Sequence, residues 1–93
     1  MAQQEVTGNP ALITATNTES NKIIFVGLDP IKSAVEIATI EIVSGTFNFN
    51  SAGSASSING VYTTGDKLIV SFGNGKDINY KAANTSESFK ISF

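Results

Sequence analysis

Residues 87–93, with the sequence ESFKISF, carry the pattern that decides the fold class. Three large apolar side chains, Phe89, Ile91 and Phe93, alternate there with polar ones. Because successive side chains of a β-strand point to opposite faces, this pattern predicts a strand with one buried face. Residues 46–50, with the sequence TFNFN, repeat the alternation. The chain is therefore expected to consist of half-buried strands.

Short apolar runs elsewhere in the chain, separated by Gly, Asn and Asp, predict further strands. They cover residues 11–16, 22–27, 35–43, 67–72 and 78–80. Within the third run, Ala38, Ile40 and Ile42 fall on one face, and the apolar phase shifts near Ala38, which suggests a bulge. The Asn59-Gly60 pair predicts a type I′ hairpin turn, because both residues tolerate positive φ.

Seven to eight short strands with closely spaced turns predict an all-β chain. We expect one domain over residues 1–93, a single antiparallel β-sandwich with Ig-like or jelly-roll-like topology. Residues 1–10 are expected to form a flexible lead-in. The expected core comprises Leu12, Ile24, Val26, Ile37, Ile40, Ile42, Phe47, Phe49, Leu68, Val70, Phe72, Tyr80, Phe89 and Ile91.

The composition argues against catalysis. The chain contains no His and no Cys, and it lacks a Ser nucleophile with a neighbouring base, so we expect no enzyme activity. Its net charge is -2, and its lysines are spread singly along the sequence. Nucleic-acid binding requires clustered cations, so we expect no nucleic-acid partner. No apolar run approaches the roughly 20 residues that span a bilayer, so we expect no membrane insertion.

Only oxygen ligands are available for a metal ion. Asp29, Asp66 and Asp77 each lie in a predicted turn, but they form no coordinating run, and turn formation explains all three. We therefore expect no metal and no cofactor. Charged residues are only 15% of the chain, and Ser, Thr and Asn supply much of its polarity. This composition is common in secreted β modules and suggests an extracellular or cell-surface location.

Two functional hypotheses follow. The first is a non-catalytic binding or adhesion module that recognises a protein or glycan partner through a sheet face or edge. The second is a structural subunit of a surface filament, pilus or virion that self-associates by β-strand addition. For either, the candidate edge strand is the one that carries Phe89, Ile91 and Phe93, because its apolar stripe has to be covered.

The segment from Lys22 to Val43 resembles the later strands of cohesin modules. A hydrophobic strand, KIIFVG, is followed by a loop and then by EIATIEI, which is similar to the "(L/F/I)-A-T-(I/L)" strand of that family. Cohesins are extracellular β-sandwiches with jelly-roll topology that bind dockerins through a sheet face. The resemblance implies an Ig-like, extracellular sandwich with non-catalytic protein recognition.

Overall fold

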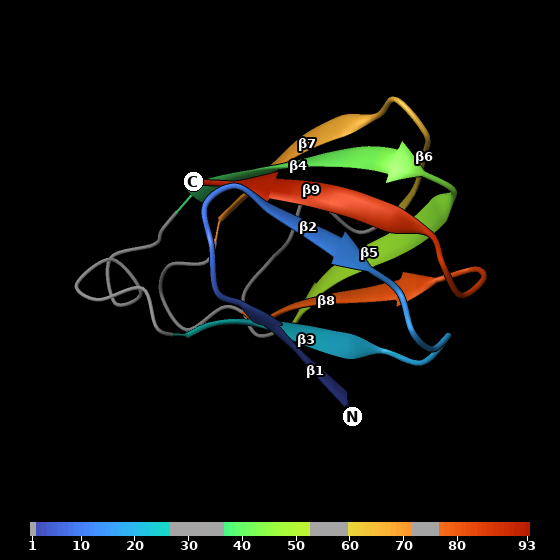
Figure 1. Cartoon of the computed structure of the whole chain (residues 1–93), viewed down its shortest axis with the longest axis horizontal. Helices are drawn as coiled ribbons and strands as arrows, with labels where there is room; N and C mark the ends of the chain where they lie inside the picture. Colours follow the sequence, from blue (N-terminus) through green and yellow to red (C-terminus); the bar gives the residue numbers. More distant parts are fainter. Residues whose placement is uncertain (1, 27–36, 53–59, 72–76) are drawn as a thin grey trace.

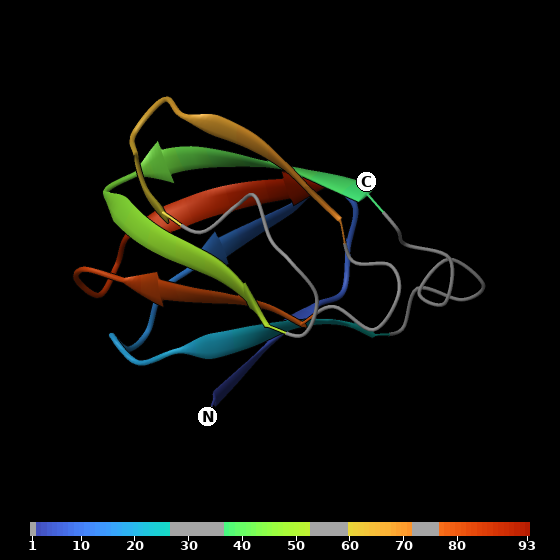
Figure 2. The same ribbon diagram turned by 180° about the vertical axis from the view of Figure 1, so that it is seen from behind.

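The computed structural model describes residues 2–26, 37–52, 60–71 and 77–93, and this part of the chain is all-β, as predicted (Figure 1). Its strands are β1 (Ala2–Val6), β2 (Ala11–Thr14), β3 (Asn21–Phe25), β4 (Ile37–Ser44), β5 (Thr46–Ala52), β6 (Gly60–Thr63), β7 (Lys67–Ser71), β8 (Asp77–Ala82) and β9 (Ser88–Ser92). They form a five-stranded sheet, in the order β1-β3-β8-β5-β6, and a four-stranded sheet, in the order β2-β9-β4-β7. Figures 1 and 2 show the two layers from opposite sides.

The strand pairing is that of one long hairpin folded into two layers. Four antiparallel pairs are nested in the sequence: β5 with β6, β4 with β7, β3 with β8 and β2 with β9. Wrapping this ribbon brings β9 against β4 and β8 against β5, again antiparallel. Eight strands connected in this way make a jelly roll. Of the two topologies expected from the sequence, the jelly roll is the one observed.

β1 is a ninth strand outside this jelly roll. It pairs in parallel with β3, over a register that runs from Ala2 opposite Asn21 to Val6 opposite Phe25. Val6 is fully buried. The expectation of a flexible lead-in over residues 1–10 therefore does not describe residues 2–6, and the sandwich is not purely antiparallel. One buried valine in a polar segment is too weak a pattern to predict a strand.

Alternation within the strands places the core between the two sheets. Phe47, Phe49 and Tyr80 come from the five-stranded sheet, and Phe89 comes from the other. The rings of Phe47 and Phe89 meet edge to face, with centroids 5.1 Å apart, and Tyr80 packs against Phe89 at the same centroid distance. Such edge-to-face contacts favour a fixed arrangement of the rings beyond simple burial.

Three of the expected core positions have the wrong phase. Leu12 is 63% exposed, and its neighbour Ile13 is buried instead. Ile37 is likewise 63% exposed, whereas Ala38 is buried. Adjacent apolar residues leave the inward face undetermined, because a shift of one position reverses every side chain. The same ambiguity explains the wrong prediction for Ile24 in β3, because Ile23 is the buried residue of this pair and Ile24 is half-buried.

The predicted inward face of β4 is confirmed from Ala38 onward, but the predicted bulge lies at another position. Ala38, Ile40 and Ile42 are buried on one face, as predicted. The irregularity in pairing lies between Ile42 and Ser44, opposite β9, and not near Ala38. Val26, expected in the core, is half-buried beyond the end of β3.

Gly60 does not form the predicted hairpin turn. It begins β6 opposite Phe49, and its φ is not positive, as a type I′ turn would require. Positive φ occurs instead at Gly45 and Gly65, at 98° and 93°. Each joins one sheet to the other, Gly45 between β4 and β5 and Gly65 between β6 and β7. Asn59, Phe72 and Asp29 lie outside the described residues.

Candidate binding site

The predicted edge strand is in the interior of its sheet. β9 lies between β2 and β4, so it has a hydrogen-bonded neighbour on each side (Figure 1). Phe89 and Ile91 are fully buried, and Phe93 packs edge to face on Phe25 with a centroid distance of 5.1 Å. The edge assignment was wrong because alternation reveals which face of a strand is buried, but not how many neighbours the strand has. These side chains cover the chain's own core.

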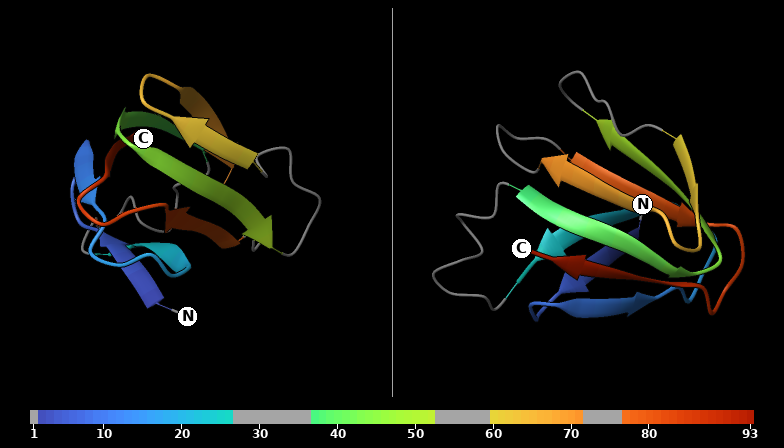
Figure 3. Two further views of the ribbon diagram at one scale, coloured as in Figure 1. Left: turned by 90° about the vertical axis from the view of Figure 1, so that its right-hand side faces the viewer. Right: turned by 90° about the horizontal axis from the view of Figure 1, so that it is seen from above.

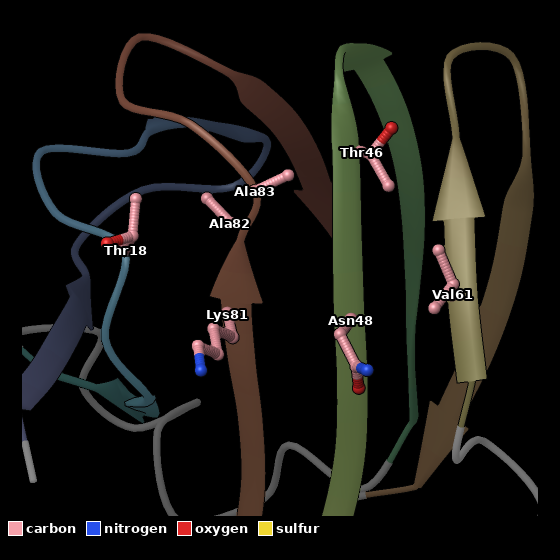
Figure 4. Close-up of a pocket in the computed structure, with 7 residues that line it drawn as sticks. All are labelled: Thr18, Thr46, Asn48, Val61, Lys81, Ala82 and Ala83. Carbon is pink, nitrogen blue, oxygen red and sulfur yellow. The ribbon is translucent and has the colours of Figure 1, made fainter.

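A hollow of about 360 Å³ lies instead on the five-stranded sheet (Figure 4). It extends over β8, β5 and β6, which are adjacent strands of that sheet. Figure 3 gives two further views of the whole sandwich. One residue of the loop before β3 also lines it. The lining residues are Thr18, Thr46, Asn48, Val61, Lys81, Ala82 and Ala83.

Alternation and register explain why the central lining residues meet. In β5, Phe47 and Phe49 point into the core, so Asn48 points outward. In β8, Tyr80 and Ala82 are buried, so Lys81 is outward, directly opposite Asn48. Val61 of β6 is opposite Asn48 on the other side. The three side chains therefore form one row across three strands.

Hydrogen bonds hold the rim of the hollow in place. Asn21 is buried, and its side-chain amide donates to the Asn17 carboxamide oxygen at 3.0 Å and to the Glu19 carbonyl at 2.8 Å. These bonds fix the turn that carries Thr18. At the other end, the Ala83 amide donates to the Thr46 carbonyl at 3.1 Å. The rim is therefore formed before any ligand arrives, which reduces the entropy lost on binding.

The hollow offers a mixed set of contacts. Lys81 supplies an ammonium donor, Asn48 supplies an amide, and two threonines supply hydroxyl groups. Val61, which is 62% exposed, adds an apolar surface together with the exposed Ala83. Among the described residues, no carboxylate lies within ion-pair distance of Lys81. The ammonium group is thus available to a ligand.

A second row of polar residues lies next to the first. Gln3, Lys22, Asn79 and Asn50 are opposite one another across β1, β3, β8 and β5. Asn79 is only 5% exposed, although alternation places it away from the core, and its side-chain oxygen has no hydrogen-bond partner among the described residues. An unpaired buried acceptor costs about 1–3 kcal/mol. This face therefore contains an acceptor whose hydrogen-bonding capacity is unused.

The outer face of the four-stranded sheet is different. Ile37 and Ile69 are exposed there as diagonal neighbours on β4 and β7, and Leu12 is exposed on β2. Lys90 and Glu41 form an ion pair with a nitrogen–oxygen distance of 3.6 Å. Large apolar side chains and paired charges make this face less suited to a polar ligand.

The described residues contain no group of three acidic side chains placed to hold a metal ion. Asp66 acts in its turn, where its carboxylate accepts a hydrogen bond of 2.8 Å from the Thr63 amide. Asp29 lies outside the described residues, as does the side chain of Asp77. No helix among the described residues is long and apolar enough to span a membrane.

Sequence reasoning did not identify the hollow, although part of the signal was present. The outward positions Asn48 and Lys81 follow from alternation in β5 and β8. Their pairing depends on the order of the strands, which local patterns do not contain. Comparison with known proteins adds no candidate, because no family model, curated protein or solved structure matches the chain. The resemblance to cohesins stays a prediction.

Proposed function

We propose that this chain is a non-catalytic binding module of an extracellular or cell-surface protein. Its ligand is a glycan that binds on the outer face of the five-stranded sheet, at the hollow around Lys81. The observation that carries this proposal is the row of Lys81, Asn48 and Val61 across three adjacent strands, with preformed rims beside it.

The size and chemistry of the hollow support a sugar ligand. Ligand sites usually have volumes of about 300–1,000 Å³, and this hollow falls within that range. Its hydroxyl, amide and ammonium groups match the hydroxyl groups of a sugar, and Lys81 adds a preference for a carboxylate. The buried tyrosine and phenylalanine rings of the five-stranded sheet face the core, so recognition depends on hydrogen bonds rather than on ring stacking.

Calorimetric titration with a panel of oligosaccharides tests this proposal. Neutral glucans and uronate-containing chains of equal length form the two arms. We expect the acidic arm to bind more tightly, and we expect Lys81→Ala to weaken binding about tenfold or more, as for loss of a charged hydrogen bond. Lys67→Ala is the matched control, because Lys67 is an exposed lysine on β7 in the other sheet. Absence of heat with every oligosaccharide would contradict the glycan proposal.

A protein partner is the second candidate, and the exposed Ile37 and Ile69 favour it. Adjacent apolar side chains on a sheet face are typical of the centre of a protein interface. A partner that loses affinity with Ile69→Lys, but not with Lys81→Ala, would assign binding to the four-stranded sheet.

A further inference from the structure

We propose that the edge of β3, which β1 covers in this structure, also accepts the β1 strand of a second copy of this chain. The two copies would exchange β1 strands, so that the β1–β3 contacts seen within one chain would form between the two copies. This surface is separate from the proposed glycan site, and its test does not depend on glycan binding.

The jelly roll is complete without β1. Each strand from β2 to β9 takes part in the nested pairs, whereas β1 pairs with β3 alone among the strands that the structure describes. Removing β1 leaves the remaining sheets closed on each other but exposes the hydrogen-bonding groups along one edge of β3. Such an edge is a template for another strand.

The edge of β3 is specific for the sequence of β1. Val6 fills a fully buried position, and its carbonyl accepts a hydrogen bond of 3.1 Å from the Val26 amide. The Tyr80 hydroxyl donates to the Gln4 side-chain oxygen at 2.8 Å. An identical strand from a second copy makes the same contacts, so the occupant that fits best is this chain itself.

The connection to β2 allows the exchange. Asn9 is held to the other end of the described chain, because its side-chain oxygen accepts from the Phe93 amide at 3.0 Å and its side-chain amide donates to the Phe93 carbonyl. Thr7 and Gly8 lie between this fixed point and β1, and a Cβ atom added at Gly8 would have the Pro10 carbonyl oxygen, 3.6 Å away, as its nearest described neighbour. They form the hinge.

β2, an edge strand of the four-stranded sheet, is less able to leave its place than β1. β2 is held at its start by Asn9 and at its end by Ala15, whose amide donates to the Glu87 carbonyl at 2.8 Å. The Ser86 amide donates back to the Ala15 carbonyl at 2.8 Å. β2 is therefore held at both of its ends within its own chain, whereas the described contacts of β1, namely its pairing with β3 and the contacts of Gln4 and Val6, would all be formed again by an exchanged strand.

Single-cysteine variants test the exchange, since the chain has no cysteine of its own. Gln3 and Lys22 are opposite each other in the β1–β3 register. A Gln3→Cys chain and a mass-labelled Lys22→Cys chain are mixed in a glutathione redox buffer. The chain concentration is about millimolar, comparable to the effective concentration of a short tether. A disulfide between the two labels can form only between copies, and mass spectrometry counts it.

The control mixture pairs Asn48→Cys with Lys81→Cys, which are exposed and opposite each other on two interior strands. We expect mixed disulfides in excess of the statistical proportion for the Gln3 and Lys22 mixture, and no excess for the control. Glu5→Cys with Ile24→Cys, opposed in the same register, repeats the test if either first variant fails to fold. An equal yield in test and control mixtures would overturn the proposal. Predominant Gln3→Cys homodimers would overturn it too, because they indicate contact between two β1 strands.

Discussion

The outer faces of the two sheets differ although both sheets share one core. The five-stranded sheet presents amide, hydroxyl and ammonium groups around a hollow, and it keeps its aromatic rings inside. The four-stranded sheet exposes Ile37 and Ile69, at 63% and 70%. Hydrophobic content alone therefore does not identify the inside of this sandwich. The polar, indented face and the apolar face lie on opposite sides of the sandwich and differ in the chemistry that they offer to a ligand.

We expect the greatest difference in stability between variants of the inward and the outward face of β4. Ile40 and Ile37 are both in β4, but Ile40 is fully buried and Ile37 is exposed. Ile40→Ala should lower the free energy of unfolding by about 2–5 kcal/mol, because it leaves a cavity. Ile37→Ala should change it by less than about 0.5 kcal/mol. Urea denaturation measures both, and equal losses would mean that β4 has another face inward.

The second effect concerns the two turns that join the sheets. Gly45 and Gly65 both have positive φ, so alanine at either should cost about 1–2 kcal/mol from backbone strain. A Cβ atom at Gly45 would also overlap the Glu87 carboxylate, whereas no described atom lies within 4 Å of a Cβ atom at Gly65. That carboxylate accepts from the Thr46 amide at 3.0 Å and from the Asn84 amide at 2.8 Å.

We therefore expect Gly45→Ala to destabilise the fold more than Gly65→Ala. Thermal unfolding followed by circular dichroism compares the two variants. A smaller loss of stability for Gly45→Ala would show that the Glu87 side chain moves away without cost and does not hold the turn between β4 and β5.

The third effect distinguishes two buried asparagines of the five-stranded sheet. Asn21→Leu removes the two hydrogen bonds that fix the Thr18 turn, and it should cost about 1–3 kcal/mol. Asn79→Leu removes an oxygen that has no partner in the described part of the chain, and it should leave stability unchanged or raise it. Chemical denaturation decides between these outcomes. A large loss from Asn79→Leu would show that its oxygen is paired.

The smallest effect is a dependence on pH. Burial raises the pKa of the Tyr80 phenol above its ordinary value of 10.0. The folded state then holds this proton more tightly than the unfolded state. The contribution of Tyr80 to stability is therefore fully present below pH 10.0, and it is lost as the pH rises through the pKa of the folded state. Tyr80→Phe should reduce this fall, as followed by urea midpoints between about pH 8 and 11. An identical fall in both proteins would place its origin elsewhere.

Local patterns in the sequence predicted the fold class and the faces of the strands with clean alternation. Phe47 and Phe49 in β5, Leu68 and Val70 in β7, and Phe89 in β9 are buried as expected. The phase failed where two apolar residues are adjacent, as at Leu12 and Ile13, because either can point inward.

The position of each strand within its sheet depends on contacts between distant segments, which no local pattern contains. For this reason β9 was expected at an edge, and β1 was not expected to be a strand. The hollow was missed for the same reason. Its residues are separated in the sequence and meet only because β8, β5 and β6 are neighbours.

We propose that the polar face of the five-stranded sheet is the binding face. Backbone amide chemical shifts, followed during titration with the oligosaccharide of the panel that binds most tightly, test this assignment. We predict that the amide chemical shifts of Asn48, Val61 and Lys81 change together and reach saturation at the same ligand concentration. The amide chemical shifts of Ile37 and Ile69 should not change. Shifts confined to the Ile37 and Ile69 face would contradict the account.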